Sequence, residues 1–304
     1  MKAIISGSTG LVGRAVTRYF SSNGIDVLCL GRQILDTNES NNLFGLGPKY
    51  LRISMAEIAQ LPSKVIDASW DPGAECVFFN FAWEGLQNLT DGSFEEQLNN
   101  VNNSVEAIRA AKKLGCIKFV NAGTLDETFT ERYLKGEYQI VNLYNSQSYA
   151  LAKLAARDMC KMVAYLEKVD YVHTRMSVPL MPDLSDGNYI ATTLRNIYEG
   201  CHFEMPSNNG LYDILLMDDV VRAFLLIGIY GVNKSDYYIG TSKSTTLEKY
   251  FISFQRILKG ETVSDIDIYL KNPHDIFDTN QLFSETGFIA SKNFLNIKDY
   301  LLIV

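Results

Sequence analysis

A tyrosine and a lysine four residues apart are the side chains of this sequence best suited to acid–base chemistry. Tyr149 and Lys153 lie in residues 148–166, a stretch rich in good helix formers and free of Gly and Pro. Positions four apart share one face of a helix, so the phenol and the ammonium converge. A cation within about 4–6 Å favours the phenolate. We therefore expect Lys153 to lower the pKa of Tyr149 and to make it a proton donor and acceptor near neutral pH.

The same spacing recurs once more, at Tyr230 and Lys234. In a chain with 17 tyrosines such a pair arises easily by chance, so the spacing alone is weak support. Gly231 and Asn233 lie inside the second pair and favour a loop there. The functional reading of Tyr149 therefore depends on the rest of the chain.

The beginning of the chain has the pattern of a strand, a glycine turn and a helix. Residues 1–6 are mostly apolar, and Gly7, Gly10 and Gly13 precede an amphipathic segment that continues to about residue 22. Glycines at these positions permit a tight turn and bring the backbone close to a pyrophosphate, with helix N-terminal amides facing the anion. The segment is typical of dinucleotide binding, and a purely structural turn is the alternative.

An arginine follows the second predicted strand, residues 26–30. NAD-binding folds usually carry an acid at the end of this strand, where it bonds the adenosine ribose, whereas an arginine there accommodates a 2′-phosphate. Gly31 takes the place of the acid, and Arg32 supplies the cation. We therefore expect NADP(H) as the preferred cofactor, with NAD(H) possible. The alternative is that Arg32 is a solvated surface residue.

Two further residues follow predicted strands, at the edge where open α/β sheets bind ligands. Trp83 comes after the buried strand at residues 76–81, and Thr124 comes after the strand at residues 117–121. A hydroxyl at Thr124 can hydrogen-bond a carbonyl or alkoxide oxygen beside Tyr149, although a threonine here is also a common turn residue. Trp83 either lines the nicotinamide or substrate pocket or caps the core.

Continuous apolar strands alternate with helices, which predicts an α/β fold with a doubly wound, Rossmann-like parallel sheet. Beyond residue 177 the alternation weakens, and we expect a smaller, interleaved C-terminal substrate lobe. The predicted sheet domain covers residues 1–175, with 211–240 returning to it, and the predicted lobe covers residues 176–210 and 241–304. Residues 36–47 and 126–145 are rich in polar and turn residues, so we expect loops there.

Composition limits the possible partners. A chain of 304 residues that is 47% hydrophobic and 21% charged is long enough for a well-buried core. Its net charge of −7 and its pI near 5.1 argue against nucleic acid as a partner. No apolar run reaches the roughly 18 residues of a membrane helix, and the first apolar segment is too short for a signal peptide. We therefore expect no membrane partner and a cytoplasmic location.

Cysteine and histidine offer little further chemistry. The five cysteines are widely spaced and include no C-x-x-C, so we expect buried, reduced thiols. The three histidines are far apart in the sequence and show no metal-ligand spacing, so no metal site is expected.

Taken together, these motifs resemble the extended short-chain dehydrogenase/reductase family, in its nucleotide-sugar epimerase, dehydratase and reductase branch. The resemblance spans most of the chain. It rests on the glycine turn Gly7–Gly13, Phe81-Ala82, Asn100-Val101, Ala122-Gly123-Thr124, the Tyr149/Lys153 pair, and Leu211 to Val220, which is similar to the family's YDFIYVDDV-like segment. The sequence departs from the family after the sixth strand, where Ser177-Val178 stand in place of the usual Asn that contacts substrate.

The resemblance implies a catalytic set of Thr124, Tyr149 and Lys153. Tyr149 would be the acid/base, Lys153 would lower its pKa and hold the nicotinamide ribose, and Thr124 would orient the substrate oxygen. The implied cofactor-binding residues are Gly7, Thr9, Gly10, Leu11, Gly13, Arg32, Ala82, Asn100, Tyr149 and Lys153. The implied substrate contacts are Trp83, Thr124, Asp126 and Ser177, with a nucleotide sugar as the substrate and a homodimer as the assembly.

Within this family the residues favour a reductase. The 4,6-dehydratases carry Thr-Asp-Glu, but here Leu125 stands between Thr124 and Asp126, so we expect the acids to point differently and rank a dehydratase low. Arg32 favours a reductase that consumes NADPH over a 4-epimerase that retains NAD, which is the alternative. A non-catalytic NADP sensor is disfavoured, because such proteins typically lack the Tyr–Lys pair. The sequence thus predicts NAD(P)H-dependent reduction of a nucleotide-linked 4-keto-(6-deoxy)sugar, as in NDP-4-keto-6-deoxyhexose reductases of polysaccharide pathways.

Overall fold

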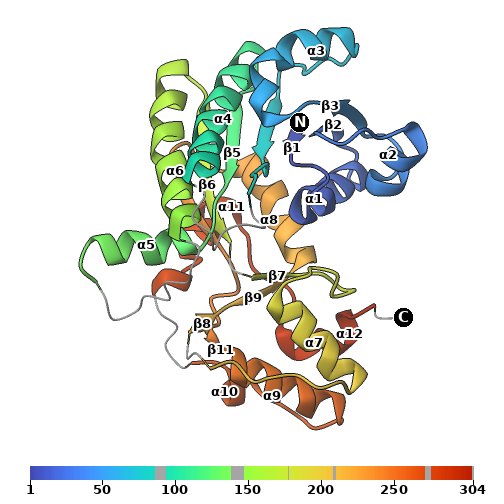
Figure 1. Cartoon of the computed structure of the whole chain (residues 1–304), viewed down its shortest axis with the longest axis vertical. Coiled ribbons are helices and arrows are strands. Elements are labelled where there is room, and N and C mark those ends of the chain that lie inside the picture. Colours follow the sequence, from blue (N-terminus) through green and yellow to red (C-terminus); the bar gives the residue numbers. More distant parts are fainter. Residues whose placement is uncertain (86–93, 138–146, 177, 208–209, 271–274, 303–304) are drawn as a thin grey trace. The chain divides into compact units, whose positions relative to one another are not determined.

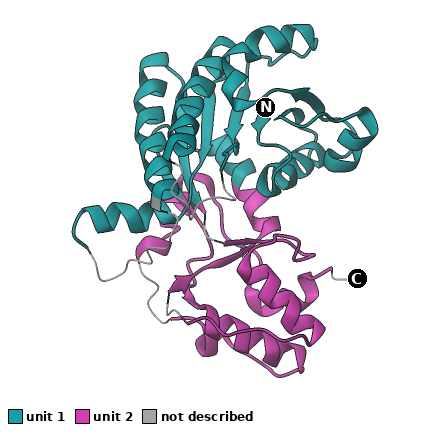
Figure 2. Ribbon diagram, in the orientation of Figure 1, with its two compact units in different colours: residues 1–175, 224–237 teal, residues 176–223, 238–304 magenta. Residues whose placement is uncertain are grey.

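The computed structural model describes residues 1–85, 94–137, 147–176, 178–207, 210–270 and 275–302. The chain divides into two compact units (Figure 2): unit 1 comprises residues 1–175 and 224–237, and unit 2 comprises residues 176–223 and 238–304. Residues 211–223 belong to unit 2, whereas the sequence predicts that the whole of 211–240 returns to the sheet domain.

Unit 1 is built on a seven-stranded sheet with the order β10-β6-β5-β4-β1-β2-β3 (Figure 1). Its strands are β1 (Lys2–Ser6), β2 (Asp26–Gly31), β3 (Lys49–Arg52), β4 (Cys76–Asn80), β5 (Lys118–Ala122), β6 (Asp170–Met176) and β10 (Asp236–Ile239). Every pair from β3 through to β6 runs parallel. The chain order reverses between β1 and β4, and a crevice for ligands forms at such a point beyond the carboxyl ends of the strands. The predicted doubly wound parallel sheet is confirmed.

Helices cover both faces of this sheet because neighbouring strand residues point to opposite sides. The helical segments are α1 (Leu11–Ser22), α2 (Thr37–Phe44), η1 (Met55–Gln60), α3 (Leu61–Asp67), α4 (Phe94–Lys113), α5 (Asp126–Leu134), α6 (Gln147–Glu167) and α8 (Met217–Tyr230), the last of which enters unit 1 at Phe224. Phe78 packs in one core cluster with Val105 of α4 and Cys160 of α6. Its neighbour Phe79 meets Phe20 of α1 edge-on, with 5.1 Å between ring centroids.

Two segments that we expected to be loops contain helices. Helix α2 begins with a capping box, in which Asp36 accepts the Glu39 N–H at 2.8 Å and Glu39 accepts the Asp36 N–H at 2.9 Å. Helix α5 begins at Asp126, and its first turn carries two acids, which the helix dipole favours. The polar residues that suggested loops are therefore largely helix-start residues. Residues 138–146 lie outside the described part of the chain.

Unit 2 has short strands and helices with a core of its own. Its strands are β7 (Val178–Leu180), β8 (Leu211–Tyr212), β9 (Ile214–Leu216) and β11 (Thr245–Thr246), and its helical segments include α7 (Tyr189–Glu199), α9 (Leu247–Leu258), α10 (Asp265–Ile268), η4 (Asp275–Phe277), α11 (Asn280–Thr286), η5 (Phe294–Asn296) and α12 (Ile297–Tyr300). Strand β7 pairs with β9, and β8 pairs with β11. Tyr250 and Phe251 of α9 lie at the centre of the core. Buried Asp213 accepts bonds from the N–H and hydroxyl of Thr241, and burial raises the pKa of Asp213 to about 6.

The cysteines follow the prediction with one exception. Four of the five are buried free thiols, but Cys201 is exposed. It follows Gly200, the left-handed residue that ends α7, and so lies at the surface. Among the helices that the structure describes, none is both long and apolar enough to span a membrane.

Candidate active site

The glycine turn between β1 and α1 forms a cradle of bare backbone. Gly7 has a φ of +66°, and a Cβ there would lie 2.7 Å from the backbone nitrogen of Ala82. A Cβ on Gly13 would overlap the Gly7 carbonyl oxygen, so the first turns of α1 pack directly on the loop. Gly10 is the N-cap residue just before α1, and no side chain caps the helix start, which leaves the first N–H groups of α1 for an anion. These residues fit a dinucleotide pyrophosphate.

Two side chains of α4 hold the segment that follows β4. Asn100 is buried; its amide accepts the Glu84 N–H and donates to the Glu84 carbonyl oxygen, both at 3.0 Å. Gln97 is also buried and accepts a hydrogen bond from Trp83 Nε1 at 2.8 Å. The amide of Asn100 thus shapes the loop, and its direct contact with a cofactor stays a prediction. Sequence reasoning missed Gln97.

The structure brings Tyr149 and Lys153 together on α6. The Lys153 Nζ lies 5.9 Å from the centroid of the Tyr149 ring and 4.0 Å from that of Trp83. It also donates to the Ala122 carbonyl oxygen at 2.8 Å. Trp83 in turn meets Tyr149 edge-on, with 6.0 Å between centroids. Because Lys153 is only 5% exposed, burial lowers its pKa to about 8.

The pKa of Tyr149 moves in the direction opposite to our prediction. Burial and the charges of Asp126 and Glu127 raise the pKa of Tyr149, and a hydrogen bond with the Thr124 hydroxyl offsets this only in part. Lys153 does not lower it, since its ammonium bonds to a carbonyl and lies against an indole. The phenol is therefore protonated at neutral pH, the state that a proton donor needs.

Thr124 and Asp126 lie beside this phenol. The Asp126 N–H donates to the Thr124 hydroxyl oxygen at 3.4 Å, and the same hydroxyl is hydrogen-bonded to the Asp126 carboxyl. Burial raises the pKa of Asp126. We expected Leu125 to make the acids point differently from those of dehydratases; in this chain the Asp126 carboxyl stays beside the Thr124 hydroxyl. Leu125 itself is buried, and the first turn of α5 brings Asp126 back to Thr124.

Glu127 points into the sheet instead. Its carboxylate accepts the Thr124 N–H at 2.8 Å and lies 2.8 Å from Nε2 of His173. Burial opposes the charged form, but His173 and the Thr124 N–H outweigh it and lower the pKa of Glu127. Sequence reasoning did not identify Glu127 and His173 as site residues. The available signal was a histidine within a strand, directly after the buried pair Tyr171-Val172.

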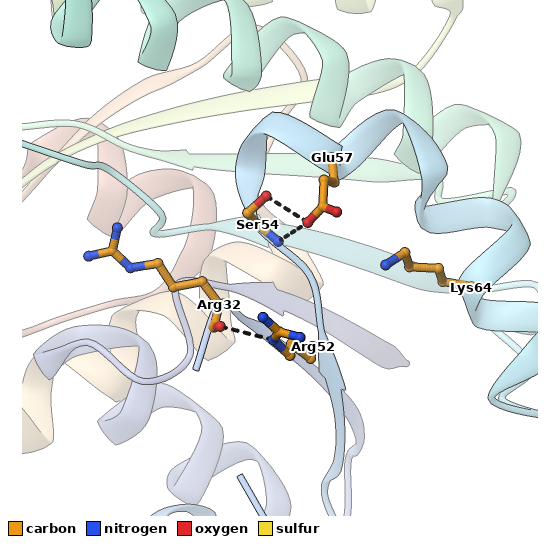
Figure 3. Close-up of a pocket in the computed structure, with 5 residues that line it drawn as sticks. All are labelled: Arg32, Arg52, Ser54, Glu57 and Lys64. Atoms are coloured by element: carbon orange, nitrogen blue, oxygen red, sulfur yellow. Dashed lines mark hydrogen bonds between the residues drawn. The ribbon is translucent and has the colours of Figure 1, made fainter. Parts of the chain in front are cut away.

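Arg32 follows β2 and belongs to a cationic hollow of about 280 Å³ (Figure 3). The hollow is lined by Arg32, Arg52, Ser54, Glu57 and Lys64. Arg52 Nε donates to the Arg32 carbonyl oxygen at 3.4 Å, while the Arg32 guanidinium points away from Arg52 (Figure 3) and pairs with Glu84 at 3.3 Å. Three cationic residues and one acid, Glu57, line the hollow, so its lining carries net positive charge.

The remaining predicted residues fall in three places. Thr9 lies next to Gly31, where a Cβ would come within 3.2 Å of the Thr9 methyl, and Leu11 is the first residue of α1. Ser177 lies outside the described residues. Tyr230 ends α8, and Lys234 follows in a loop with a φ of 73°, so the second Tyr–Lys pair does not share a helix, as predicted.

A family model described as "NAD dependent epimerase/dehydratase family" matches residues 3–240. A search of curated proteins finds no match.

Several solved structures share the fold over nearly the whole chain. A UDP-glucose 4-epimerase from Thermotoga maritima, solved with UDP-glucose, is 17% identical, with a TM-score of 0.71 over 97% of this chain and 95% of that one. The Bordetella bronchiseptica enzyme WbmG, solved with NAD and UDP, is 16% identical, with a TM-score of 0.72 over 99% and 94%. A dTDP-glucose 4,6-dehydratase from Bacillus anthracis, solved with NAD, is 17% identical, with a TM-score of 0.72 over 99% and 95%.

Proposed function

The chain belongs to the NAD-dependent epimerase/dehydratase family, and from that premise we propose that it reduces a nucleotide-linked 4-keto-(6-deoxy)sugar with NADPH. One observation carries the proposal: Thr124, Tyr149 and Lys153 converge at the carboxyl edge of the sheet that carries the glycine cradle. A nicotinamide cofactor, when bound, supplies the hydride.

The residues supply the proton and the orientation. Addition of hydride to a ketone leaves an alkoxide, which needs a nearby proton and a hydrogen bond. The Tyr149 phenol is protonated and partly accessible, so it serves as the proton donor. The Thr124 hydroxyl, already hydrogen-bonded to that phenol, orients the substrate oxygen. The buried ammonium of Lys153 would hold the nicotinamide ribose.

The preference for NADPH rests on the cationic hollow. A 2′-phosphate on the adenosine ribose would meet Arg32 at the end of β2, with Arg52 and Lys64 adding positive charge. The solved structures of WbmG and the B. anthracis dehydratase contain NAD. The preference is therefore proposed as a property of this chain, with NAD(H) as the weaker cofactor.

A nucleotide sugar is the proposed substrate. The T. maritima epimerase was solved with UDP-glucose, and WbmG was solved with UDP. In this chain, Trp83 and Asp126 flank Tyr149 and are the proposed contacts to the sugar. Ser177 is the other proposed contact.

A 4,6-dehydratase is the second candidate because of Asp126. Its carboxyl lies at the Thr124 hydroxyl, and its raised pKa favours the protonated form that could assist loss of water. The Thr–Leu–Asp order still differs from that of dehydratases, so the reductase is preferred. A 4-epimerase that retains NAD would use the same Tyr149 and Lys153.

One assay separates the three activities. The protein is incubated with NADPH and a panel of dTDP- and UDP-linked 4-keto-6-deoxyhexoses, then with the parent nucleotide hexoses and NAD. A reductase consumes one NADPH for each keto sugar reduced. An epimerase interconverts hydroxyl epimers, and a dehydratase forms a 4-keto-6-deoxy product, both without net change in cofactor. Formation of an epimer or of a 4-keto-6-deoxy sugar without NADPH consumption would replace our proposal. Tyr149→Phe is the control and should be inactive in the same assay.

We also propose a homodimer formed through α4 and α6, which pack side by side within unit 1 (Figure 1). The two helices expose large apolar side chains at Phe94, Leu98, Met159, Met162, Tyr165 and Leu166. Apolar patches of this kind commonly mark protein interfaces. Sedimentation should give a dimer for the natural protein and a monomer for Met162→Glu. A monomeric natural protein would contradict this proposal.

The cytoplasmic location stays a prediction.

A further inference from the structure

Four polar side chains form a continuous row across four adjacent strands of the sheet. Ser6, Asn80, Asn121 and His173 are direct neighbours in the register of β1, β4, β5 and β6. Each is no more than 2% exposed. Strands buried on both faces are normally apolar throughout, and a buried polar group is costly unless it is paired. A row of four such groups in strict register therefore calls for a physical role.

Hydrogen bonds join the row in a single direction. The Ser6 hydroxyl donates to Asn80 Oδ1 at 2.6 Å, and Asn80 Nδ2 donates to Asn121 Oδ1 at 2.9 Å. The amide nitrogen of Asn121 then lies 3.3 Å from His173 Nδ1. Because Nδ1 faces this donor, and the Tyr171 hydroxyl at 3.3 Å, it acts as an acceptor. The ring hydrogen therefore sits on Nε2.

The row ends at the proposed catalytic threonine. His173 Nε2 donates to one oxygen of Glu127 at 2.8 Å, and the other oxygen accepts the Thr124 N–H at 2.8 Å. Gly123 packs directly on this pair, because a Cβ there would overlap both Glu127 Oε1 and His173 Nε2. The backbone before Thr124 is thus pressed against the end of the row, and the backbone of Thr124 is bonded to it.

We propose that His173 and Glu127 are positioning residues that set the Thr124 hydroxyl for proton transfer, and that the row from Ser6 fixes their orientation. This inference rests on the proposed function, in which Thr124 orients the substrate oxygen. Glu127 accepts two donors with a fixed geometry, and His173 can serve it only in the Nε2–H tautomer. The directed row selects that tautomer and holds the ring. Misplacement of a reacting group by about 1 Å can cost about 100-fold in rate.

The start of the row adds a second anchor. Ser6 is the last residue of β1 and immediately precedes Gly7 of the cradle. Its hydroxyl oxygen also accepts the Ala82 N–H at 3.4 Å. One end of the row therefore holds the cofactor turn, and the other holds the Thr124 loop. The polar groups align the proposed hydride and proton sites on one rigid sheet, a role that apolar side chains could not take.

The first test needs no substrate. The chain has three histidines, so ¹⁵N NMR of labelled imidazoles gives few signals, and His173→Gln assigns the one of interest. We expect the hydrogen of the His173 ring on Nε2 and an Nδ1 that accepts hydrogen bonds. We also expect strong exchange protection of the Thr124 amide. An Nδ1–H tautomer or an unprotected Thr124 amide in the natural protein would overturn the inference.

The second test separates positioning from stability. His173→Phe leaves a buried carboxylate without its partner and risks misfolding, so the double variant His173→Phe/Glu127→Leu, which removes both polar partners, is measured beside it. We expect kcat with NADPH and a 4-keto-6-deoxyhexose nucleotide to fall about 10- to 100-fold. The Kd for NADPH should stay within about twofold, because the glycine cradle is intact, and exchange protection of the Thr124 amide should be lost.

Thr174→Val is the matched control. Thr174 is the buried neighbour of His173 on β6, and its hydroxyl donates to the Asn121 carbonyl oxygen at 3.2 Å. In the part of the chain that the structure describes, this hydroxyl has no hydrogen bond to Glu127 or Thr124. This variant should change kcat less than about threefold, because the neutral hydrogen bond that it loses supports the fold and does not reach Glu127 or Thr124. A folded double variant with kcat near that of the natural protein would refute the positioning role. If instead Tyr149→Phe kept full activity, the proposed function would fail. The NMR measurement would still show whether the row fixes the His173 tautomer and the Thr124 amide.

Discussion

The two ends of the proposed site differ in how much water reaches them. At the Tyr149 end, Lys153 is 5% exposed and bonds to a carbonyl, and the tyrosine and lysine pKa values move in opposite directions, each away from the charged form. At the Arg32 end, the guanidinium is 71% exposed, and its partner Glu84 is also open to solvent. Desolvation strengthens electrostatic interactions at the first end, whereas water and salt screen them at the second.

This difference sets the scale of each expected effect. Buried groups have fixed partners, so the loss of one group changes the chemistry strongly. Exposed charged pairs contribute little, typically about 0.2–1 kcal/mol. Substitutions around Tyr149 should therefore change rates by large factors, and substitutions around Arg32 should change affinities by small ones.

The largest effect is expected for Tyr149→Phe. This change keeps the ring against Trp83 but removes the proposed proton donor. The chemical step should slow by about 10²–10⁴-fold, the usual contribution of general acid–base catalysis. Single-turnover kinetics with NADPH and the keto sugar measure it, and cofactor affinity should hardly change. Tyr230→Phe, at the exposed end of α8, is the matched control and should keep full turnover.

Lys153→Met should weaken cofactor binding in a pH-dependent way. Burial lowers the pKa of Lys153 from 10.5 to about 8, so the natural protein loses this charge as the pH rises through about 8. Cofactor affinity should be full below that pH and fall above it. Below about pH 8, Lys153→Met should bind the cofactor about 10- to 100-fold more weakly than the natural protein, as expected for the loss of a charge-assisted bond. The cofactor affinity of this variant should not change as the pH passes through about 8. Cofactor titrations at pH values on both sides of 8 measure the affinity and its pH dependence. If the affinity of Lys153→Met still fell near pH 8 as in the natural protein, Lys153 would not be the group responsible.

The same shift predicts how stability depends on pH. An unfolded chain restores the ordinary lysine pKa of 10.5, so between about 8 and 10.5 the unfolded state binds more protons than the folded state. The contribution of Lys153 to the free energy of unfolding should therefore rise with pH through this window. Chemical denaturation of the natural protein and Lys153→Met should show a smaller rise in the variant.

Arg32→Ala should reduce the affinity for NADPH about tenfold, toward the low end for a charge-assisted bond, because the guanidinium is well solvated. Affinity for NADH should change little, since NADH lacks the 2′-phosphate. Isothermal titration with both cofactors measures the ratio. Equal losses for both would show that Arg32 does not recognise the phosphate.

Thr124→Val should have a smaller effect than Tyr149→Phe. It removes one neutral hydrogen bond to the substrate oxygen while the proton donor remains, so kcat should fall about 3- to 10-fold. The backbone N–H that Glu127 accepts is unchanged, which keeps the loop in place. A loss as large as that of Tyr149→Phe would mean that Thr124 takes part in the proton transfer itself.

Local patterns in the sequence predicted the sheet and the glycine turn because both depend on short-range spacing. The apolar strands, the glycines and the helix carrying Tyr149 could all be found this way. Capping boxes are equally local, and Asp36 with Glu39 could have predicted α2.

Contacts between distant segments could not be predicted in this way. Whether Lys153 bonds to Ala122, and whether Asp126 or Glu127 faces the phenol, depends on how α5 and α6 pack beside β5. The polar row depends on the register of four strands, which no single segment specifies. The sequence nevertheless places polar residues in strands that are otherwise mostly apolar, at Asn80, Asn121 and His173. Polar residues at such positions indicate a buried hydrogen-bond network.

The smallest effect concerns Glu84, the acid that pairs with Arg32 at 3.3 Å. A 2′-phosphate must compete with this carboxylate for the guanidinium. Glu84→Gln removes the competing charge, while the backbone of residue 84 remains bonded to Asn100. An exposed pair of this kind is worth less than about 1 kcal/mol, so NADPH affinity should rise only about two- to threefold, and less at high salt. NADH affinity should not change.

Glu95→Gln is the control for the loss of one negative charge, because Glu95 is an exposed acid at the start of α4. It should leave both cofactor affinities unchanged. Competition titrations at low and high salt resolve a twofold difference if both variants are measured together. A gain in NADPH affinity above about tenfold for Glu84→Gln would mean that the Arg32 end is far less screened than its exposure implies, and the contrast between the two ends of the site would disappear.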